Sequence, residues 1–235
     1  MKTVERLRKD WLLSTEISKL ESRIWRAAQR DDLCTIMMTS AVRGEGKSTT
    51  IAYLATAMGL YPDRKILAID FDFRIPTLNS HFGLKVPYGV DRVLSGEVEL
   101  FKAVIRTELD GLHVLLPTAG GADPHLLHRS DKIASLIQSL RDRYDLILID
   151  SPAILPVPDS TMLMPFADAV VLAGMSGWST EPQMKRAIQI IAGLDANLLG
   201  LVVGDMQEAA PEYFAGDYHY YGYADAPSRG ERGGG

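Results

Sequence analysis

The stretch "AVRGEGKSTT", residues 41–50, has the residue types and order of a loop that holds nucleotide phosphates. It matches the phosphate-binding pattern with the first position relaxed to alanine. In such a loop successive backbone N–H groups point at phosphate oxygens, and the dipole of the following helix adds to the attraction. Gly44 and Gly46 allow the backbone to approach the phosphates closely. Lys47 is predicted to reach the β- and γ-phosphates, and the Ser48 hydroxyl to ligate Mg²⁺.

This loop lies between an apolar run and a predicted helix, and the same alternation continues along the chain. Near-continuous apolar strands separated by helices indicate a mostly parallel sheet with helices on both faces. We therefore predict one α/β domain of the P-loop NTPase kind. The predicted strands are 34–41, 64–70, 111–118, 144–150, 168–175 and 198–206, with helices over 48–60, 130–143 and 180–194.

Composition narrows the class of protein. The 235 residues are 46% hydrophobic and 23% charged, which is typical of a globular domain. The net charge of -5 argues against a general nucleic-acid-binding surface, which would be basic. The single cysteine, Cys34, excludes an internal disulfide framework. No apolar run approaches the ~20 residues of a membrane span, and the N-terminus lacks a signal peptide. We expect a cytoplasmic protein.

The chain divides into three segments. Residues 1–33 are predicted to form a charged amphipathic helix, which either packs on the flank of the domain or contacts another subunit. Residues 34–206 carry the alternating strands and helices. Residues 207–235 have no apolar periodicity and are rich in Gly, Ala, charge and tyrosine, so we expect a flexible tail.

Acidic residues end two of the predicted strands. In "ILAIDFDFR" Asp70 and Asp72 follow an apolar run, and in "LILIDSP" Asp150 does the same. Ligands bind at the carboxyl ends of strands in open α/β sheets. A single aspartate at such an end is often only a helix cap or turn residue. The phosphate loop and both acidic segments, in this order, favour a Mg²⁺-dependent nucleotide site.

Together these motifs resemble those of the bacterial tyrosine kinases of capsule and exopolysaccharide synthesis. The family pattern is S-x-x-P-G-E-G-K-S-T, then three apolar residues before D-x-D-x-R, then three apolar residues before D-x-x-P. The corresponding segments here are "SAVRGEGKST", "LAIDFDFR" and "ILIDSPA". "RIPTLNSHFG", "ADPHLL" and "PVPDSTMLMPFADAVVLAG" also look like the family, so the resemblance covers residues 34–204.

The resemblance implies an ATP- and Mg²⁺-dependent enzyme that transfers phosphate to tyrosine. Lys47 and Ser48 would hold the phosphates and Mg²⁺, and Asp72 and Asp150 would organise the metal. Asp70 is the candidate for orienting or deprotonating the incoming phenol. The residues implied to bind the nucleotide are Arg43, Gly44, Glu45, Gly46, Lys47, Ser48 and Thr49.

Three departures from the family pattern matter. Arg43 replaces the usual proline of the loop, and Gly204 stands where an asparagine near the adenine is usual. The N-terminal oligomerisation motif E-x-x-R-x-x-R is out of register, with Glu21, Arg23 and Arg26 in "ESRIWR". Base recognition and assembly of a ring through this helix are therefore open.

Five of the nine tyrosines lie in the tail, in a segment with no core to join. A mobile tyrosine cluster is typical of a substrate that enters a neighbour's active site. We predict that the tail is phosphorylated in trans, and that the added charge dissolves a head-to-tail assembly. A tail that merely contacts other surfaces is the alternative. The predicted acceptors are Tyr213, Tyr218, Tyr220, Tyr221 and Tyr223.

Two other functions fit the same fold. One is an ATPase switch of the MinD and ParA kind, but the signature lysine of those proteins is replaced here by Val42. The other is a regulator that binds ATP without transferring phosphate, which Arg43 and Gly204 keep open.

The resemblance also implies partners. Family members are fused to, or depend on, a membrane-spanning activator, a polysaccharide co-polymerase. A cognate tyrosine phosphatase and self-association, possibly as a ring, are expected as well. The chain would then be recruited to the inner face of the membrane through its partner, with no nucleic acid involved.

Overall fold

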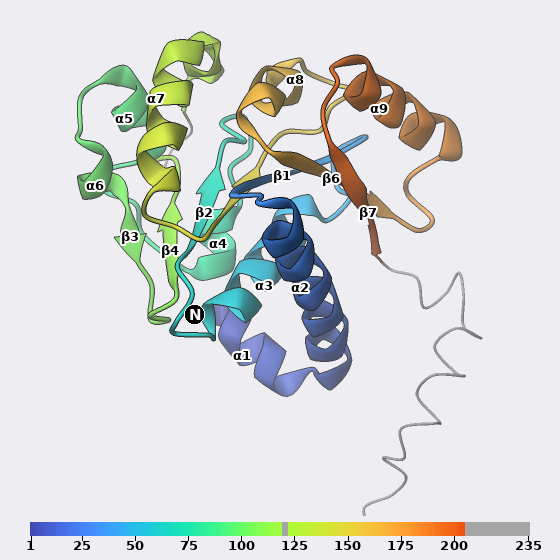
Figure 1. Cartoon of the computed structure of the whole chain (residues 1–235), viewed down its shortest axis with the longest axis horizontal. Helices are drawn as coiled ribbons and strands as arrows, with labels where there is room; N and C mark the ends of the chain where they lie inside the picture. The colour runs from blue at the N-terminus through green and yellow to red at the C-terminus, as the bar shows by residue number, and fades with distance from the viewer. Residues whose placement is uncertain (119–121, 205–235) are drawn as a thin grey trace, which may run out of the picture.

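The computed structural model describes residues 1–118 and 122–204, which form one sheet with helices on both faces (Figure 1). The strand order is β3-β4-β2-β5-β1-β6-β7, and every neighbouring pair is parallel except β3 and β4. This confirms the predicted mostly parallel α/β fold. The strands are β1 (Thr35–Ser40), β2 (Ile66–Asp70), β3 (Ile105–Arg106), β4 (Leu112–Leu115), β5 (Leu146–Asp150), β6 (Ala169–Met175) and β7 (Leu198–Gly204).

Two apolar clusters, one on each side of the sheet, form the core. Every residue of β1, β2 and β5 is buried, as expected for central strands covered on both faces. One face is covered by α2 (Trp11–Asp31), α3 (Lys47–Gly59) and α4 (Leu78–Phe82). The opposite face is covered by α5 (Val90–Ser95), α6 (Leu100–Ala103), α7 (Ser130–Arg141), α8 (Asp159–Leu163) and α9 (Glu181–Gly193).

The N-terminal segment differs from the prediction of a single helix. It forms two helices, α1 (Lys2–Lys9) and α2, which meet at Asp10. The backbone of Asp10 is extended, and its side chain accepts a hydrogen bond from the Leu13 N–H at 3.0 Å. Asp10 therefore caps the start of α2, where a short acidic side chain replaces the missing backbone acceptor. Continuous apolar periodicity across this point concealed the break.

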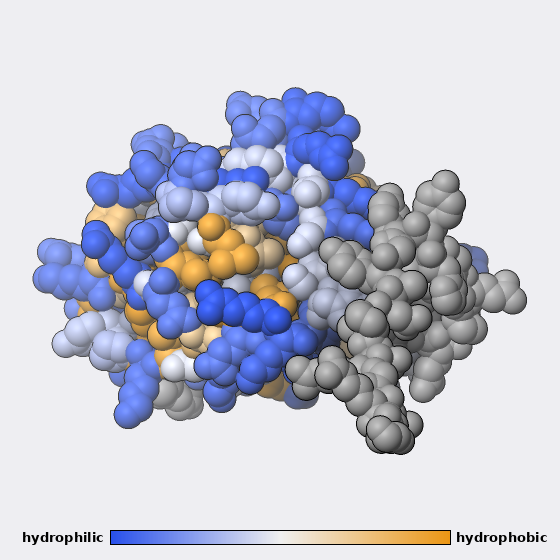
Figure 2. Space-filling model, turned by 90° about the horizontal axis from the view of Figure 1, so that it is seen from below, coloured by the Kyte–Doolittle hydropathy of each residue, from blue (hydrophilic) through white to orange (hydrophobic). Residues whose placement is uncertain are grey.

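Helix α1 crosses the end of α3 that is remote from the phosphate loop. Leu7 packs with Ile17, Tyr53 and Ala57 in a third small apolar cluster. Seen from below, this part of the molecule shows apolar side chains surrounded by hydrophilic ones (Figure 2). A cleft of about 430 Å³ lies here between α1, α2 and α3.

The sequence did not reveal several short elements. β3 has two residues and pairs antiparallel to β4, with Ile105 opposite Val114. Two residues are too few for any periodicity to show. Short 3₁₀ helices cover Pro124–His128 and Met164–Phe166. None of the helices in the described residues is both long enough and apolar enough to span a membrane.

Candidate active site

The phosphate loop connects β1 to α3 at the carboxyl edge of the sheet. Gly44 and Gly46 have φ angles of 87° and 78°, a region that side chains rarely adopt. Gly46 also precedes the first residue of α3, so the helix N-terminus faces the loop. A Cβ atom at Gly44 would lie 3.4 Å from the indole nitrogen of Trp178. Both glycines are therefore required by the backbone of the loop.

Lys47 lies at the centre of the site. Its ammonium forms an ion pair with Asp72 at 3.1 Å and is 3.3 Å from the Ser48 hydroxyl. Burial lowers the pKa of Lys47, but the charges of Asp150 and Asp72 outweigh it and raise the pKa above its usual range. Lys47 therefore stays charged at neutral pH, which a phosphate ligand requires.

Asp150 is buried and unpaired. Asp150 is opposite Asp70 on the neighbouring parallel strand. Within the part of the chain that the structure describes, neither carboxylate oxygen of Asp150 has a hydrogen-bond partner. Burial raises its pKa to about 6, although the nearby Lys47 and Ser48 lower it. A buried carboxylate without a partner is costly unless a ligand completes the site.

Asp70 faces backbone rather than open space. One oxygen accepts the Asp72 N–H at 2.9 Å, and the other accepts the Thr77 and Leu78 N–H groups, each at 3.3 Å. Burial and the neighbouring Asp150 raise the pKa of Asp70 well above its usual range. In this conformation Asp70 holds the segment 72–78 against the end of β2.

The residues present fit Mg²⁺ that arrives with a nucleotide. Among residues 1–118 and 122–204, no three His, Cys, Asp or Glu side chains are placed to hold a metal ion by themselves. Mg²⁺ typically uses one or two carboxylates together with substrate phosphates. Asp150, which is close to Ser48, and Asp72, which pairs with Lys47, supply that number of ligands.

The loop that follows β6 holds the phosphate loop in place, a feature that the sequence did not indicate. The indole N–H of Trp178 donates to the Arg43 carbonyl at 2.9 Å. The Ser179 hydroxyl donates to Glu45, whose other oxygen accepts the Val42 N–H at 2.8 Å. Trp178 and Ser179 are more than 130 residues from the loop, and no motif marks them.

Three residues of the predicted nucleotide-binding set have side chains that are either engaged in other contacts or exposed. Glu45 is 2% exposed, and its side chain stabilises the loop through hydrogen bonds with Val42 and Ser179. Arg43 and Thr49 are exposed, and the Thr49 hydroxyl is 3.4 Å from the His81 ring. Their backbone remains part of the loop.

A second arrangement joins the acidic motif to the segment after β5. Arg74 forms a bidentate ion pair with Asp159, with N–O distances of 2.7 and 3.1 Å. Asp159 is buried at the start of α8, whereas Arg74 is partly exposed. The pair ties the segment that carries Asp72 to α8. "PVPDS" stood out in the sequence, but nothing there identified this partner.

Glu21 of the displaced oligomerisation motif is used inside the chain. It is buried and forms an ion pair with Arg64. The Arg64 guanidinium lies 4.0 Å from the Trp25 ring and 3.9 Å from the Tyr61 ring. Glu21 is thus engaged with the segment between α3 and β2, whereas Arg23 and Arg26 of the same motif are exposed.

The remaining predicted positions lie at the end of β7 or beyond the described residues. Gly204 ends β7, and its carbonyl accepts the Ser176 N–H at 3.0 Å. The five candidate acceptors lie outside the described residues: Tyr213, Tyr218, Tyr220, Tyr221 and Tyr223.

Comparison with known proteins assigns the chain to a family. Residues 34–191 match the family model described as an AAA domain. The chain is 30% identical over 228 residues to the tyrosine-protein kinase YwqD of Bacillus subtilis, with 94% of each chain covered. The chain belongs to the family of bacterial tyrosine kinases. This kinase family is the one that the three motifs had indicated.

Other members and relatives agree with the fold. The chain is 25% identical to the tyrosine-protein kinase etk of Escherichia coli, of which it spans only 24%. It superposes on the kinase domain of that protein with a TM-score of 0.73, and the superposition covers 80% of this chain and 73% of that one. The cell division ATPase MinD of Pyrococcus furiosus, 29% identical, gives a TM-score of 0.62 over 72% and 71% of the chains.

Proposed function

We propose that this protein is an ATP- and Mg²⁺-dependent protein-tyrosine kinase that phosphorylates its own tyrosine-rich tail in trans. Through this reaction it regulates the synthesis or export of a polysaccharide. The observation that carries the proposal is the buried Asp150, which has no hydrogen-bond partner among the described residues and lies close to Lys47 and Ser48 at the phosphate loop. Membership of the kinase family supports transfer to tyrosine rather than to water.

The side chains divide the task of phosphoryl transfer, which needs mainly positioning and charge neutralisation. Lys47 would leave Asp72 for the β- and γ-phosphate oxygens, which replace the carboxylate as partners of its ammonium. Ser48, Asp72 and Asp150 would hold Mg²⁺, which offsets the negative charge of the phosphates. Arg43 and Gly44 contribute backbone N–H groups, and Trp178 fixes their conformation through the Arg43 carbonyl.

Asp70 is the proposed acceptor of the phenol proton. Burial and the neighbouring Asp150 raise its pKa, which makes this carboxylate a stronger base than an ordinary aspartate. The Asp70 oxygen that accepts from Thr77 and Leu78 does so over long distances, 3.3 Å each. A small movement of segment 72–78 would free this oxygen to accept the proton. The phenol oxygen would then attack the γ-phosphorus while the bond to the bridging oxygen breaks and ADP leaves.

The direct test is incubation with γ-labelled ATP and Mg²⁺, followed by mass spectrometry of the tail. We expect labelled tail tyrosines in the unmodified chain and none in Lys47→Met, because the phosphates lose their cation. Phosphate release without labelled protein would instead indicate a MinD-like ATPase switch. Nucleotide binding without either product would indicate a regulator without kinase activity.

We further propose that a membrane-spanning polysaccharide co-polymerase activates the chain and recruits it to the inner face of the membrane. Docking on such a partner raises the effective concentration of neighbouring chains, which a reaction in trans requires. We expect weak labelling alone and a several-fold higher initial rate when the cytosolic tail of the partner is added. A chain that is fully active at sub-micromolar concentration and indifferent to that peptide would contradict the partner but leave the kinase intact.

A further inference from the structure

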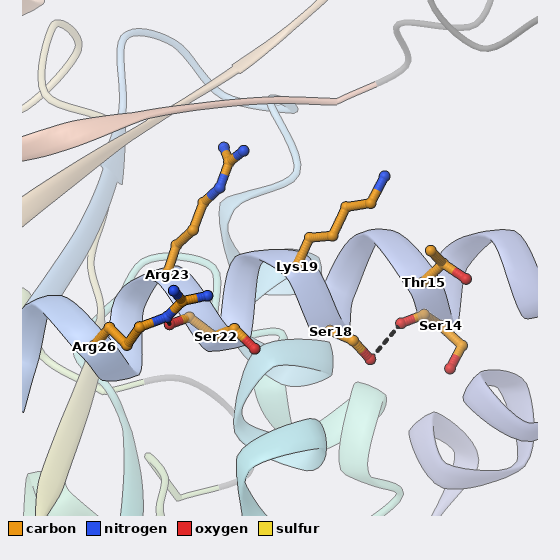
Figure 3. A pocket seen from close by; sticks show the side chains of 7 residues that line it. All are labelled: Ser14, Thr15, Ser18, Lys19, Ser22, Arg23 and Arg26. Atoms are coloured by element: carbon orange, nitrogen blue, oxygen red, sulfur yellow. Dashed lines mark hydrogen bonds between the residues drawn. The ribbon is translucent and has the colours of Figure 1, made fainter. Parts of the chain in front are cut away.

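One face of α2 is hydrophilic and basic. We define the α2 polar face by the residues along it that line a hollow of about 480 Å³, all of which among the described residues belong to α2 (Figure 3). In the close-up, Lys19 and Arg23 extend in the same direction, one helical turn apart (Figure 3). The residues are Ser14, Thr15, Ser18, Lys19, Ser22, Arg23 and Arg26.

The α2 polar face has a positive charge that acidic neighbours neutralise only at Lys19 among the described residues. It contains three cationic residues and no acidic one. The acids of the same helix are engaged: Glu16 pairs with Lys19 at 2.9 Å, and Glu21 pairs with Arg64. Across residues 1–118 and 122–204 neither arginine of this face forms an ion pair, and Arg26 donates only to the Ser22 carbonyl at 3.2 Å. Two such guanidinium groups favour a phosphate over a single carboxylate, because each binds two oxygens at once.

The described part of the chain ends beside this face. The end of β7 lies beside α2 in the whole-chain view, and β7 passes alongside α2 in the close-up (Figures 1 and 3). Leu199 and Val202 of β7 pack into the same apolar cluster as Ile24 and Ala28 of α2. From Gly204, the nine residues to Tyr213 reach up to ~30 Å when extended. The α2 polar face is only ~18 Å long, so the segment from Gly204 to Tyr213 is longer than the face when extended.

The tail has the complementary charge. Residues 207–225 contain the five tyrosines, and the acids Glu208, Glu212, Asp217 and Asp225, without any lysine or arginine. Each phosphotyrosine adds about -1.5 to -2 charges and three acceptor oxygens. Phosphorylation therefore converts a weakly acidic segment into a strongly anionic one beside Arg23 and Arg26.

We propose that the α2 polar face is the docking surface for residues 207–225 after their tyrosines are phosphorylated. This inference rests on the proposed function, since it takes the phosphorylated tail as its ligand. None of the residues of the face belongs to the phosphate loop, so a tail bound there is withdrawn from the active site. Docking then removes the product from the reaction and covers Arg23 and Arg26, the exposed arginines of the displaced oligomerisation motif.

The test measures binding of a synthetic, fluorescently labelled peptide of residues 207–225 to the full chain by anisotropy. The peptide is used unmodified or phosphorylated at Tyr218, Tyr220 and Tyr221, and the chain carries Lys47→Met so that its own tail stays unmodified. The test variant is R23E/R26E. The matched control is K132E/R186E, which makes the same charge change at exposed positions of α7 and α9. The milder R23Q/R26Q and the circular dichroism spectrum of each variant check that the chains are folded.

We expect the phosphopeptide to bind at least ten-fold more tightly than the unmodified peptide, and less tightly at high salt. R23E/R26E should lose at least ten-fold in affinity, R23Q/R26Q an intermediate amount, and K132E/R186E less than two-fold. Equal binding of both peptides, or unchanged binding by R23E/R26E, overturns the proposal. The proposal is also overturned if the face does not bind the phosphopeptide but binds phosphatidylglycerol vesicles, or a second copy of the chain, in a manner that depends on Arg23 and Arg26. Because the peptide is synthetic, its binding is independent of whether the chain labels itself.

Discussion

At the scale of single residues, the site brings several buried carboxylates close to one cation, Lys47. Asp70 and Asp150 are opposite each other on adjacent strands, and Lys47 cannot neutralise both because it pairs with Asp72. Such a cluster destabilises the fold until a ligand occupies it, which is a common cost of a functional site. The motif order in the sequence was sufficient to predict that these side chains converge. Their individual hydrogen bonds were not predictable, because they depend on how segment 72–78 turns back over β2.

The first prediction is that Asp150→Asn stabilises the nucleotide-free protein while abolishing labelling. In the folded chain the pKa of Asp150 is raised from 3.8 to about 6, so the folded chain binds this proton more tightly than the unfolded chain. The contribution of Asp150 to stability therefore falls as the pH rises from 3.8 to about 6, and stays low above that. We expect a gain on the order of 1–3 kcal/mol at pH 7.5, or several degrees in Tm.

Thermal unfolding of both chains at pH 4 and pH 7.5 checks this prediction. The difference in Tm between Asp150→Asn and the unmodified chain should be smaller at pH 4, where Asp150 is largely protonated in the folded chain. Asp145→Asn, at the other end of the same strand, is the matched control and should not gain stability, because its carboxylate accepts the Lys65 N–H. A destabilised Asp150→Asn at pH 7.5 would contradict the unpaired state of this carboxylate.

At the scale of elements, the strands that carry the site were predictable and the supports of the site were not. β2 and β5 are apolar runs that end in aspartate, and β1 is a buried run before the glycine loop; their order along the chain predicted the fold. The break at Asp10 was missed because apolar spacing continues across it, and a cap is a single side-chain contact. The loop after β6 was missed because Trp178 and Ser179 act through contacts that only the tertiary fold creates.

The second prediction concerns that loop. Trp178→Phe keeps an aromatic ring against Gly44 but removes the hydrogen bond to the Arg43 carbonyl. A lost hydrogen bond of about 1 kcal/mol predicts a rise of about five-fold in the KM for ATP, with little change in kcat. Trp11→Phe in α2, whose ring is also exposed, is the matched control and should leave KM unchanged. A fall in kcat with an unchanged KM would show that Trp178 does not act through the phosphate loop.

At the scale of the whole molecule, the fold separates two surfaces. The phosphate loop and the acidic strand ends lie at the carboxyl edge of the sheet, as is general for parallel α/β proteins. The α2 polar face belongs to the helix layer beside β7, from which the tail continues. This separation suits the proposed reaction, in which the chain is both enzyme and substrate. The sequence alone showed the two regions but not their relative positions, since these depend on the sheet order.

The central claim is that the active site of one chain phosphorylates the tail of another, and mixing two defective chains tests it most directly. One chain carries Lys47→Met and keeps its tail tyrosines. The other keeps its phosphate loop and carries phenylalanine at Tyr213, Tyr218, Tyr220, Tyr221 and Tyr223. Neither should label itself, but with γ-labelled ATP and Mg²⁺ the mixture should acquire label on the tail of the Lys47→Met chain. No label in the mixture, or label at Tyr53 or Tyr144 within the domain, would contradict the account.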